Sequence, residues 1–239
     1  VRELNTEAVK VARQAVDAFK AANPGKDAFV AGAIGPTNKT LSMSRDVNDS
    51  AKRDVTFAQV RDAYREQVDA LIDAGADLLL CETVFDTLVL KAAVFAIDEA
   101  FEARGARLPV MISGTITDAS GRTLTGQTTE AFWNSVRHAQ PISIGMNCAL
   151  GGEQMRPHIA ELAKKAEIYV SCYPNAGLPN PLSPTGFPEG PEDTAAILET
   201  FARDGLVNIL GGCCGTTPGH IAAIRRRTEK YPPRVPGEV

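Results

Sequence analysis

Three cysteines stand at positions where metal or redox chemistry could take place. Cys213 and Cys214 are adjacent, lie between glycines and come directly after the apolar stretch 206–210. Cys148 follows a second apolar stretch and precedes a Gly-Gly pair. In α/β folds the residues that come just after a buried strand form the edge at which ligands bind. The pattern therefore predicts three thiols at one edge of a sheet.

Three thiolates with an open fourth position are a ligand set typical of catalytic zinc. Sulfur ligands keep the ion soft, which suits activation of a thiol substrate better than hydrolysis by bound water. We interpret Cys148, Cys213 and Cys214 as zinc ligands, with the fourth position open to a substrate. Spacing alone leaves two other interpretations open: a strained disulfide between the adjacent cysteines, or small core residues at strand ends. The glycines favour the metal site, because they let backbone approach closely and leave the thiols accessible.

The remaining cysteines and the histidines are not expected to be ligands. Cys81 and Cys172 lie inside apolar stretches and are predicted to be core residues. The three histidines fall in predicted helical segments: His138, His158 and His220. Five cysteines, with no signal-peptide pattern at the start, indicate a reducing, cytoplasmic setting rather than a disulfide framework.

Composition places the chain among ordinary globular domains. It has 239 residues, 44% hydrophobic and 23% charged, with a net charge of -4. There is no basic surface for nucleic acid and no apolar stretch near the roughly 20 residues of a membrane span, so neither partner is expected. The length is close to the roughly 250 residues typical of one α/β barrel.

Predicted strands and helices alternate along the chain, which indicates a parallel sheet. Strands are expected at 29–34, 77–83, 109–116, 142–147, 168–173 and 207–212. Glycines and polar residues follow nearly every strand, as in a (β/α)8 TIM barrel, and no dinucleotide or P-loop motif is present. The predicted fold is therefore a TIM barrel with about six of its eight βα units in this chain. A long polar loop at 39–55 is expected to be functional or mobile.

Several long motifs resemble the zinc-dependent homocysteine S-methyltransferases, and among them the homocysteine-binding barrel of cobalamin-dependent methionine synthase. The motifs are GGCCGTTP (211–218), NCALG (147–151), GPTNKTLSMSRDVND (35–49), ETVFDTL (82–88), ISGTITDASGRTLTGQTTEAF (112–132) and SCYPNAGLPN (171–180). They are spread over almost the whole chain, so the resemblance is not confined to one site.

The resemblance assigns roles to individual residues. It implies that the three cysteines are the zinc ligands and that Glu82 binds the amino group of homocysteine. Asn147 and the backbone near Ala149 would lie on the carboxylate side, and no catalytic group separate from the zinc site is implied. From its position alone, Glu82 could equally be a carboxylate at a helix start.

The resemblance also implies a reaction. The homocysteine thiolate would attack the methyl group of methylcobalamin, held on another domain, and give methionine. Homocysteine and the cobalamin and folate domains of the same polypeptide would be the partners. Two alternatives remain: a homocysteine methyltransferase that uses betaine or S-methylmethionine, and a non-catalytic zinc or dithiol protein.

The domain prediction is a homocysteine-binding barrel over 1–231, incomplete at its N-terminus, with a linker at 232–239 toward a following domain. Family members begin with two βα units that would precede Val1. With six units, the first and last strands are not expected to pair with each other.

Overall fold

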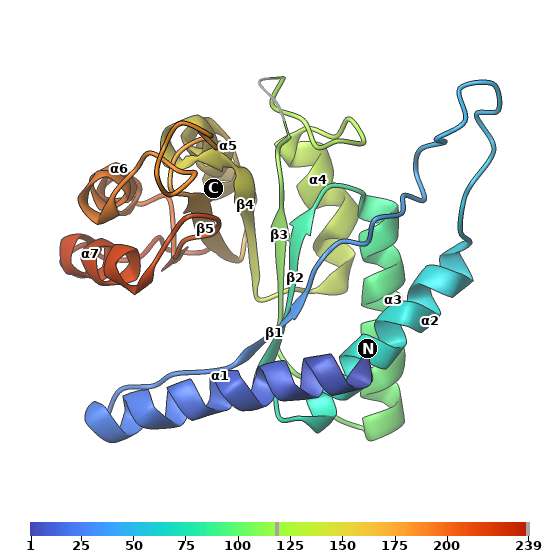
Figure 1. The fold of residues 1–239 in the computed structure, drawn as a ribbon, viewed down its shortest axis with the longest axis horizontal. Helices are drawn as coiled ribbons and strands as arrows, with labels where there is room; N and C mark the ends of the chain where they lie inside the picture. Colours follow the sequence, from blue (N-terminus) through green and yellow to red (C-terminus); the bar gives the residue numbers. More distant parts are fainter. Residues whose placement is uncertain (118–119, 238–239) are drawn as a thin grey trace. The chain divides into compact units, whose positions relative to one another are not determined.

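A computed structural model describes residues 1–117 and 120–237 of the chain. Within these residues strands and helices alternate, as the sequence predicts (Figure 1). The helices are α1 (Arg2–Ala22), α2 (Phe57–Asp73), α3 (Thr87–Arg104), α4 (Thr129–Val136), α5 (Gly152–Lys165), α6 (Pro191–Arg203) and α7 (Pro218–Thr228). The strands are β1 (Ala31–Ile34), β2 (Leu78–Val84), β3 (Val110–Gly114), β4 (Ser143–Gly151), β5 (Tyr169–Asn175) and β6 (Ile209–Leu210).

The sheet has six parallel strands in the order β1-β2-β3-β4-β5-β6. Among the described residues, β1 and β6 end this order and do not pair with each other, so the sheet is not closed. This confirms the expected α/β fold with six strands of a partial barrel. The C-terminal ends of neighbouring parallel strands lie at one edge, which places the residues after β4, β5 and β6 together.

Contacts divide the chain into two compact units, each described separately here. Unit 1 consists of Val1–Glu82 and Asp86–Met111. In it β1 pairs with β2 in register, Ala31 opposite Leu78, and α2 packs against α3. Thr56 begins α2 with a capping box, in which its hydroxyl accepts from the Gln59 N–H and the Gln59 side chain accepts from the Thr56 N–H.

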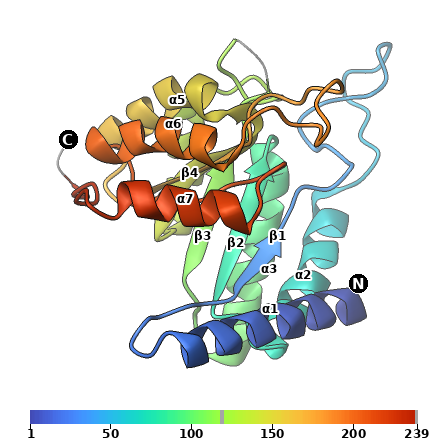
Figure 2. The same cartoon turned by 60° about the vertical axis from the view of Figure 1, so that its left-hand side comes forward.

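Unit 2 consists of Thr83–Phe85 and Ile112–Val239. Helices α5, α6 and α7 lie side by side, and α5 packs on β4 and β5 (Figure 2). The core of this unit contains large side chains that are fully buried, among them Phe132, Ile144, Met146 and Phe201. A tight core of this kind holds the strand ends in fixed positions.

Several boundaries differ from the sequence prediction. Strand β6 is only two residues long, because it pairs with β5 alone and the chain then turns into a glycine-containing loop. Helix α5 begins at Gly152, five residues before Pro157, so the proline lies inside the helix and does not begin it. Val9 is the only buried residue of α1, although Ala12, Val16 and Phe19 recur with it at helical spacing. That spacing shows which face is apolar but not how much of it a neighbour covers.

The segment after α7 is attached to unit 2. Arg234 is 6% exposed, and its guanidinium donates to the carbonyls of Ala163 at 3.0 Å and Ile168 at 2.9 Å. Its backbone N–H donates to the carbonyl of Val207 at 3.1 Å. A linker over 232–239 stays a prediction, and residues 238–239 lie outside the described part.

In the described ranges 1–117 and 120–237, no helix combines the length and the apolar character that crossing a membrane requires.

Candidate metal centre

Strand β4 and the loop between β6 and α7 bring three thiols together. Cys148 lies near the C-terminal end of β4, and Cys213 and Cys214 lie in the loop. The sulfur of Cys214 is 3.8 Å from that of Cys148 and 3.9 Å from that of Cys213. All three sulfurs lie within 4.8 Å of one another. The structure therefore places the three predicted residues at one point, with free thiols and no disulfide among them.

The backbone at Cys148 is in an unusual conformation for residues with a side chain. Cys148 has φ 62° and Ala149 has φ 60°, both in the left-handed region. The pairing of β4 with β5 is irregular here, between Asn147 and Gly151. Such conformations cost free energy and persist where the surrounding structure imposes them, commonly at functional sites. The distorted strand end carries Cys148 out of the regular ladder.

The loop that carries the other two cysteines continues the pairing with β5. The N–H of Cys213 donates to the carbonyl of Pro174 at 2.8 Å. The N–H of Cys214 donates to Oδ1 of Asn175 at 3.1 Å, and its carbonyl accepts from the N–H of Ala176 at 2.9 Å. The backbone of both cysteines is therefore held by hydrogen bonds to residues at the end of β5 and directly after it.

Position 215 requires glycine for two reasons. Its φ is +80°, and a Cβ atom at this position would collide with the ring of Phe187. Only glycine meets both conditions without strain. The loop can therefore turn directly after Cys214 toward the start of α7.

The hydrogen bonds at the start of α7 show the role of His220. Thr217 is the N-cap and Pro218 the first helical residue. Nδ1 of His220 accepts from the N–H of Thr217 at 3.1 Å, so its other nitrogen carries the proton and donates to the carbonyl of Glu189 at 3.1 Å. His220 is thus a buried capping residue. In the described part of the chain the only candidate metal cluster is made of cysteines.

The thiols differ in their electrostatic environment. Burial raises the pKa of Cys213, and repulsion from the neighbouring Cys148 and Cys214 sulfurs raises it further. Burial and the contact with Cys148 also raise the pKa of Cys214. Without a metal these thiols are protonated at neutral pH, and a cation that binds them must displace protons. Cys81 and Cys172 are 1% and 0% exposed, which confirms them as core residues.

Asn147, directly before Cys148, is fully buried. Its Oδ1 accepts from the N–H of Thr83 at 3.0 Å, and its Nδ2 donates to Oγ1 of Thr83 at 2.8 Å. The same nitrogen lies 3.8 Å from the sulfur of Cys213. The sequence analysis identified Asn147 but not Thr83 or Asn175. Both are polar residues at the end of a strand, and this position could have indicated them.

Glu82 belongs to unit 1 and lies near the end of β2. It is half-buried, and burial raises the pKa of its carboxyl. No hydrogen bond or ion pair in the described ranges engages this carboxylate. Helix α3 begins only at Thr87 and is capped by Asp86, so Glu82 is not a helix-start carboxylate. A half-buried carboxylate of this kind is a natural partner for a cationic group on a ligand.

Asp86 is a further residue of unit 1 that the sequence did not reveal. It is 2% exposed and caps α3, with Oδ1 accepting from the N–H of Leu88 at 2.9 Å. It also accepts from the N–H of Leu41 at 2.9 Å and from the hydroxyl of Ser42 at 2.6 Å. One carboxylate thereby joins the polar loop to the start of α3.

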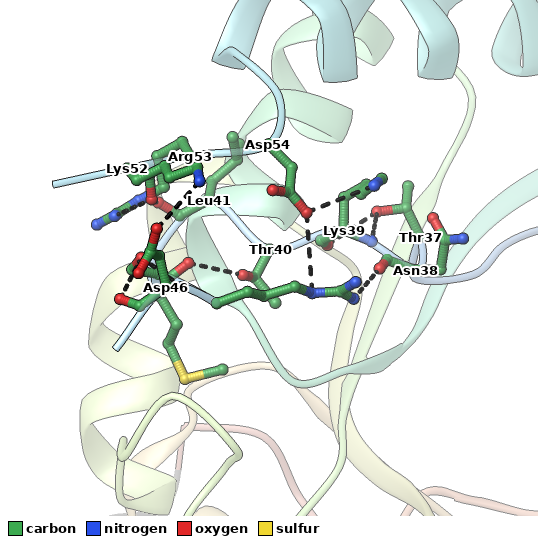
Figure 3. A network of polar contacts seen from close by, with 12 residues as sticks. Thr37, Asn38, Lys39, Thr40, Leu41, Asp46, Lys52, Arg53 and Asp54 are labelled. Carbon is green, nitrogen blue, oxygen red and sulfur yellow. Dashed lines mark hydrogen bonds and ion pairs between the residues drawn. The ribbon is translucent and has the colours of Figure 1, made fainter. Parts of the chain in front are cut away.

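The polar loop has its own network of contacts (Figure 3). Arg45 donates to the carbonyl of Asn38 at 2.6 Å, and Lys39 lies 3.4 Å from Asp54. Nε of Arg53 donates to the carbonyl of Leu41 at 2.7 Å. The loop expected over 39–55 is therefore tied both to itself and to Asp86.

Known proteins resemble this chain over most of its length. The family model described as homocysteine S-methyltransferase matches residues 1–228. The metallated form of the homocysteine methyltransferase MmuM from Escherichia coli superposes with a TM-score of 0.71 at 26% identity. That match covers 95% of this chain and 70% of the other. The apo form of the same protein gives a TM-score of 0.70 at 25% identity, over 95% of this chain and 73% of the other.

Proposed function

The chain belongs to the homocysteine S-methyltransferase family, and from this premise we propose that Cys148, Cys213 and Cys214 hold a zinc ion at which homocysteine is methylated. The observation that carries the proposal is the convergence of the three sulfurs within 4.8 Å. Three thiolates are a ligand set that zinc accepts and that leaves a coordination position for a substrate. The donor set is soft, which favours sulfur as the additional ligand.

A zinc ion held by the three cysteines would act as a Lewis acid that lowers the pKa of the homocysteine thiol from about 8.5, so that the thiolate would predominate at neutral pH. The residues of this chain orient the rest of the substrate. Glu82, half-buried and free of an ion pair in the described ranges, pairs with the ammonium group. The backbone near Ala149 meets the carboxylate. The left-handed conformation of Ala149 supports this role, since such backbone departures accompany ligand contacts.

The reaction is a nucleophilic methyl transfer. The thiol proton leaves to solvent, and an electron pair of the sulfur forms the new bond to the methyl carbon. The bond between that carbon and the donor breaks, and its electrons stay with the donor. The product is methionine. The side chain of Cys214 is exposed, which leaves an approach for a methyl donor from solvent.

For the donor we favour methylcobalamin carried on another domain of the same polypeptide, which methyltetrahydrofolate would recharge. The support is the sequence: the segments 35–49 and 112–132 resemble the methionine synthase barrel over long stretches. A protein that uses betaine or S-methylmethionine is the second candidate, because similarity to the homocysteine methyltransferase MmuM is compatible with any of these methyl donors. Five free cysteines support a reducing compartment such as the cytoplasm.

The experiment that separates these donors offers each one with a labelled methyl group. The zinc-loaded protein is incubated with homocysteine and labelled methylcobalamin, betaine or S-methylmethionine, and labelled methionine is measured. Label from methylcobalamin alone supports the methionine synthase type. Label from betaine or S-methylmethionine alone would move the chain to the other type. No methionine from any donor, with zinc bound, would favour the non-catalytic alternative.

A further inference from the structure

Both polar atoms of the Asn147 side-chain amide contact groups of the protein. The residue is 0% exposed, and both ends of its amide meet protein groups. The N–H of Thr83 can only donate, so the atom that faces it at 3.0 Å must be Oδ1. This orientation directs the two N–H bonds of Nδ2 to Oγ1 of Thr83 at 2.8 Å and to Sγ of Cys213 at 3.8 Å.

The partner of this amide is a strained residue. Thr83 has φ 57°, in the left-handed region, although its side chain is β-branched. For such a residue that conformation is strained and persists only where neighbouring groups impose it. Asn147 bonds both the backbone N–H and the hydroxyl of Thr83, and a pair of bonds fixes a conformation that a single bond would not. The strain at Thr83 is therefore maintained by Asn147.

The second N–H of the amide faces Cys213. Groups that hydrogen-bond a metal ligand orient it and tune its affinity for the metal. Asn147 is also the residue directly before Cys148 in the chain. It therefore neighbours Cys148 through the backbone and Cys213 through its side chain.

We infer that Asn147 is a positioning residue, whose amide links the strained backbone of Thr83 to the sulfur of Cys213, and that it does not touch homocysteine. The inference rests on the proposed function only where homocysteine binding is measured, and the zinc measurements do not depend on that function. It assigns the carboxylate of homocysteine to backbone groups, because the amide that the family resemblance placed there is already occupied.

Asn208 provides a matched control in the same unit. Its Oδ1 accepts from the N–H of Val170 at 2.9 Å, and its Nδ2 donates to the carbonyl of Arg234 at 2.6 Å. It is thus also an asparagine that clamps backbone, but it precedes β6, at the other end from the cysteines. Asn147→Ala and Asn208→Ala remove the same chemical group. The milder Thr83→Val keeps the shape of Thr83 and removes only the hydroxyl that Nδ2 bonds.

Three quantities are measured for each variant: zinc affinity by competition with a chelator, homocysteine affinity of the zinc-loaded protein by calorimetry, and melting temperature. Asn147→Ala should lower zinc affinity about 10–100-fold, the usual effect of losing a group that supports a metal ligand. It should also weaken homocysteine binding. Asn208→Ala should lower the melting temperature and leave both affinities unchanged. Thr83→Val should lower zinc affinity less than Asn147→Ala, and the two changes together should not add.

A rescue separates positioning from direct contact. Glycine adopts a left-handed conformation without strain, so Thr83→Gly in the Asn147→Ala protein should restore part of the homocysteine affinity but not the zinc affinity. If Asn147→Ala lost homocysteine affinity at unchanged zinc affinity, with no rescue, Asn147 would be a substrate ligand instead. Equal effects of the two alanine variants on both affinities would make its role purely structural. A wild-type protein that binds zinc but not homocysteine would contradict the proposed function. The zinc affinities of the variants would still test whether Asn147 positions the metal ligands.

Discussion

At the scale of residues, the candidate centre depends on three thiols and the groups that surround them. The sulfurs are close enough for one ion, and burial raises the pKa of Cys213 and Cys214, so metal and protons compete for them. Zinc binding must release these protons. Zinc affinity should consequently rise with pH across the neutral range.

Replacing one thiol tests the ligand set. Cys214→Ser should lose zinc and methyl transfer together, because a serine hydroxyl is a far poorer ligand for this ion than a thiolate. Cys172→Ala, a change in the core of the same unit, should cost about 1 kcal/mol of stability and leave zinc content unchanged. Metal analysis of both purified proteins gives the answer. Full zinc and full turnover in Cys214→Ser would rule out the three-thiolate site.

Glu82→Gln tests substrate recognition. Loss of the carboxylate charge should weaken homocysteine binding by about 1.5–3 kcal/mol, the range of a hydrogen bond to a charged group. Zinc content should not change. Glu189 is another half-buried carboxylate with a raised pKa, and Glu189→Gln serves as the control, with homocysteine affinity unaltered. Zinc loss in Glu82→Gln would make Glu82 a support of the metal site rather than a substrate ligand.

At the scale of elements, the end of β6 and the start of α7 could be predicted to within a few residues because their signals are local. The signals are an apolar stretch, a glycine and a Thr-Pro pair. Contacts between distant segments left no such signal. Asp86 reaches Ser42 across 44 residues, and Asn147 reaches Thr83 across 64. The left-handed conformation of Thr83 was equally hidden, since nothing in a threonine indicates it.

Asp86 should stabilise unit 1 through both the helix and the loop. Asp86→Ala removes the cap of α3 and the bonds to the loop, and should cost about 2–4 kcal/mol in the free energy of unfolding. Chemical denaturation of the variant measures this loss. Asp46→Ala, in the same loop but with solvent-exposed contacts, should have a much smaller effect. Equal losses in the two variants would contradict the anchoring role of Asp86.

The contribution of Asp86 should also depend on pH. Burial would raise its pKa, but the hydrogen bonds from Ser42, Leu41 and Leu88 outweigh it and hold the pKa below its ordinary value. A folded-state pKa below the unfolded value gives stability that is present above the unfolded pKa, about 3.9, and lost as pH falls through the folded one. The difference between wild type and Asp86→Asn should therefore shrink below about pH 4.

At the scale of the whole molecule, the fold brings the thiols to the C-terminal edge of parallel strands, where barrel enzymes place their chemistry. Sequence patterns predicted the six strands, and the resemblance to a family whose barrel has eight units implied that the sheet would be open. The division into two compact units could not be read from the sequence, because it depends on how densely distant segments pack. The thiol of Cys214 is exposed, so the proposed metal site is open to solvent.

Binding of homocysteine should release about one proton, because the substrate enters as a thiolate and its free thiol has a pKa of about 8.5. Below that pKa the affinity should rise roughly tenfold per pH unit. Calorimetry in buffers of different ionisation enthalpy measures the proton directly. Homoserine, whose hydroxyl does not ionise, is the control and should release none. A buffer-independent heat for homocysteine would mean that the thiol binds protonated.

The central claim is that the three cysteines hold zinc and leave it open to the sulfur of homocysteine. X-ray absorption at the zinc edge tests it directly, on the zinc-loaded protein with and without homocysteine. The predicted result is one zinc per chain with three sulfur ligands, increasing to four when homocysteine is added. A sulfur count that stays at three with homocysteine bound, or a protein that retains no zinc, would contradict it.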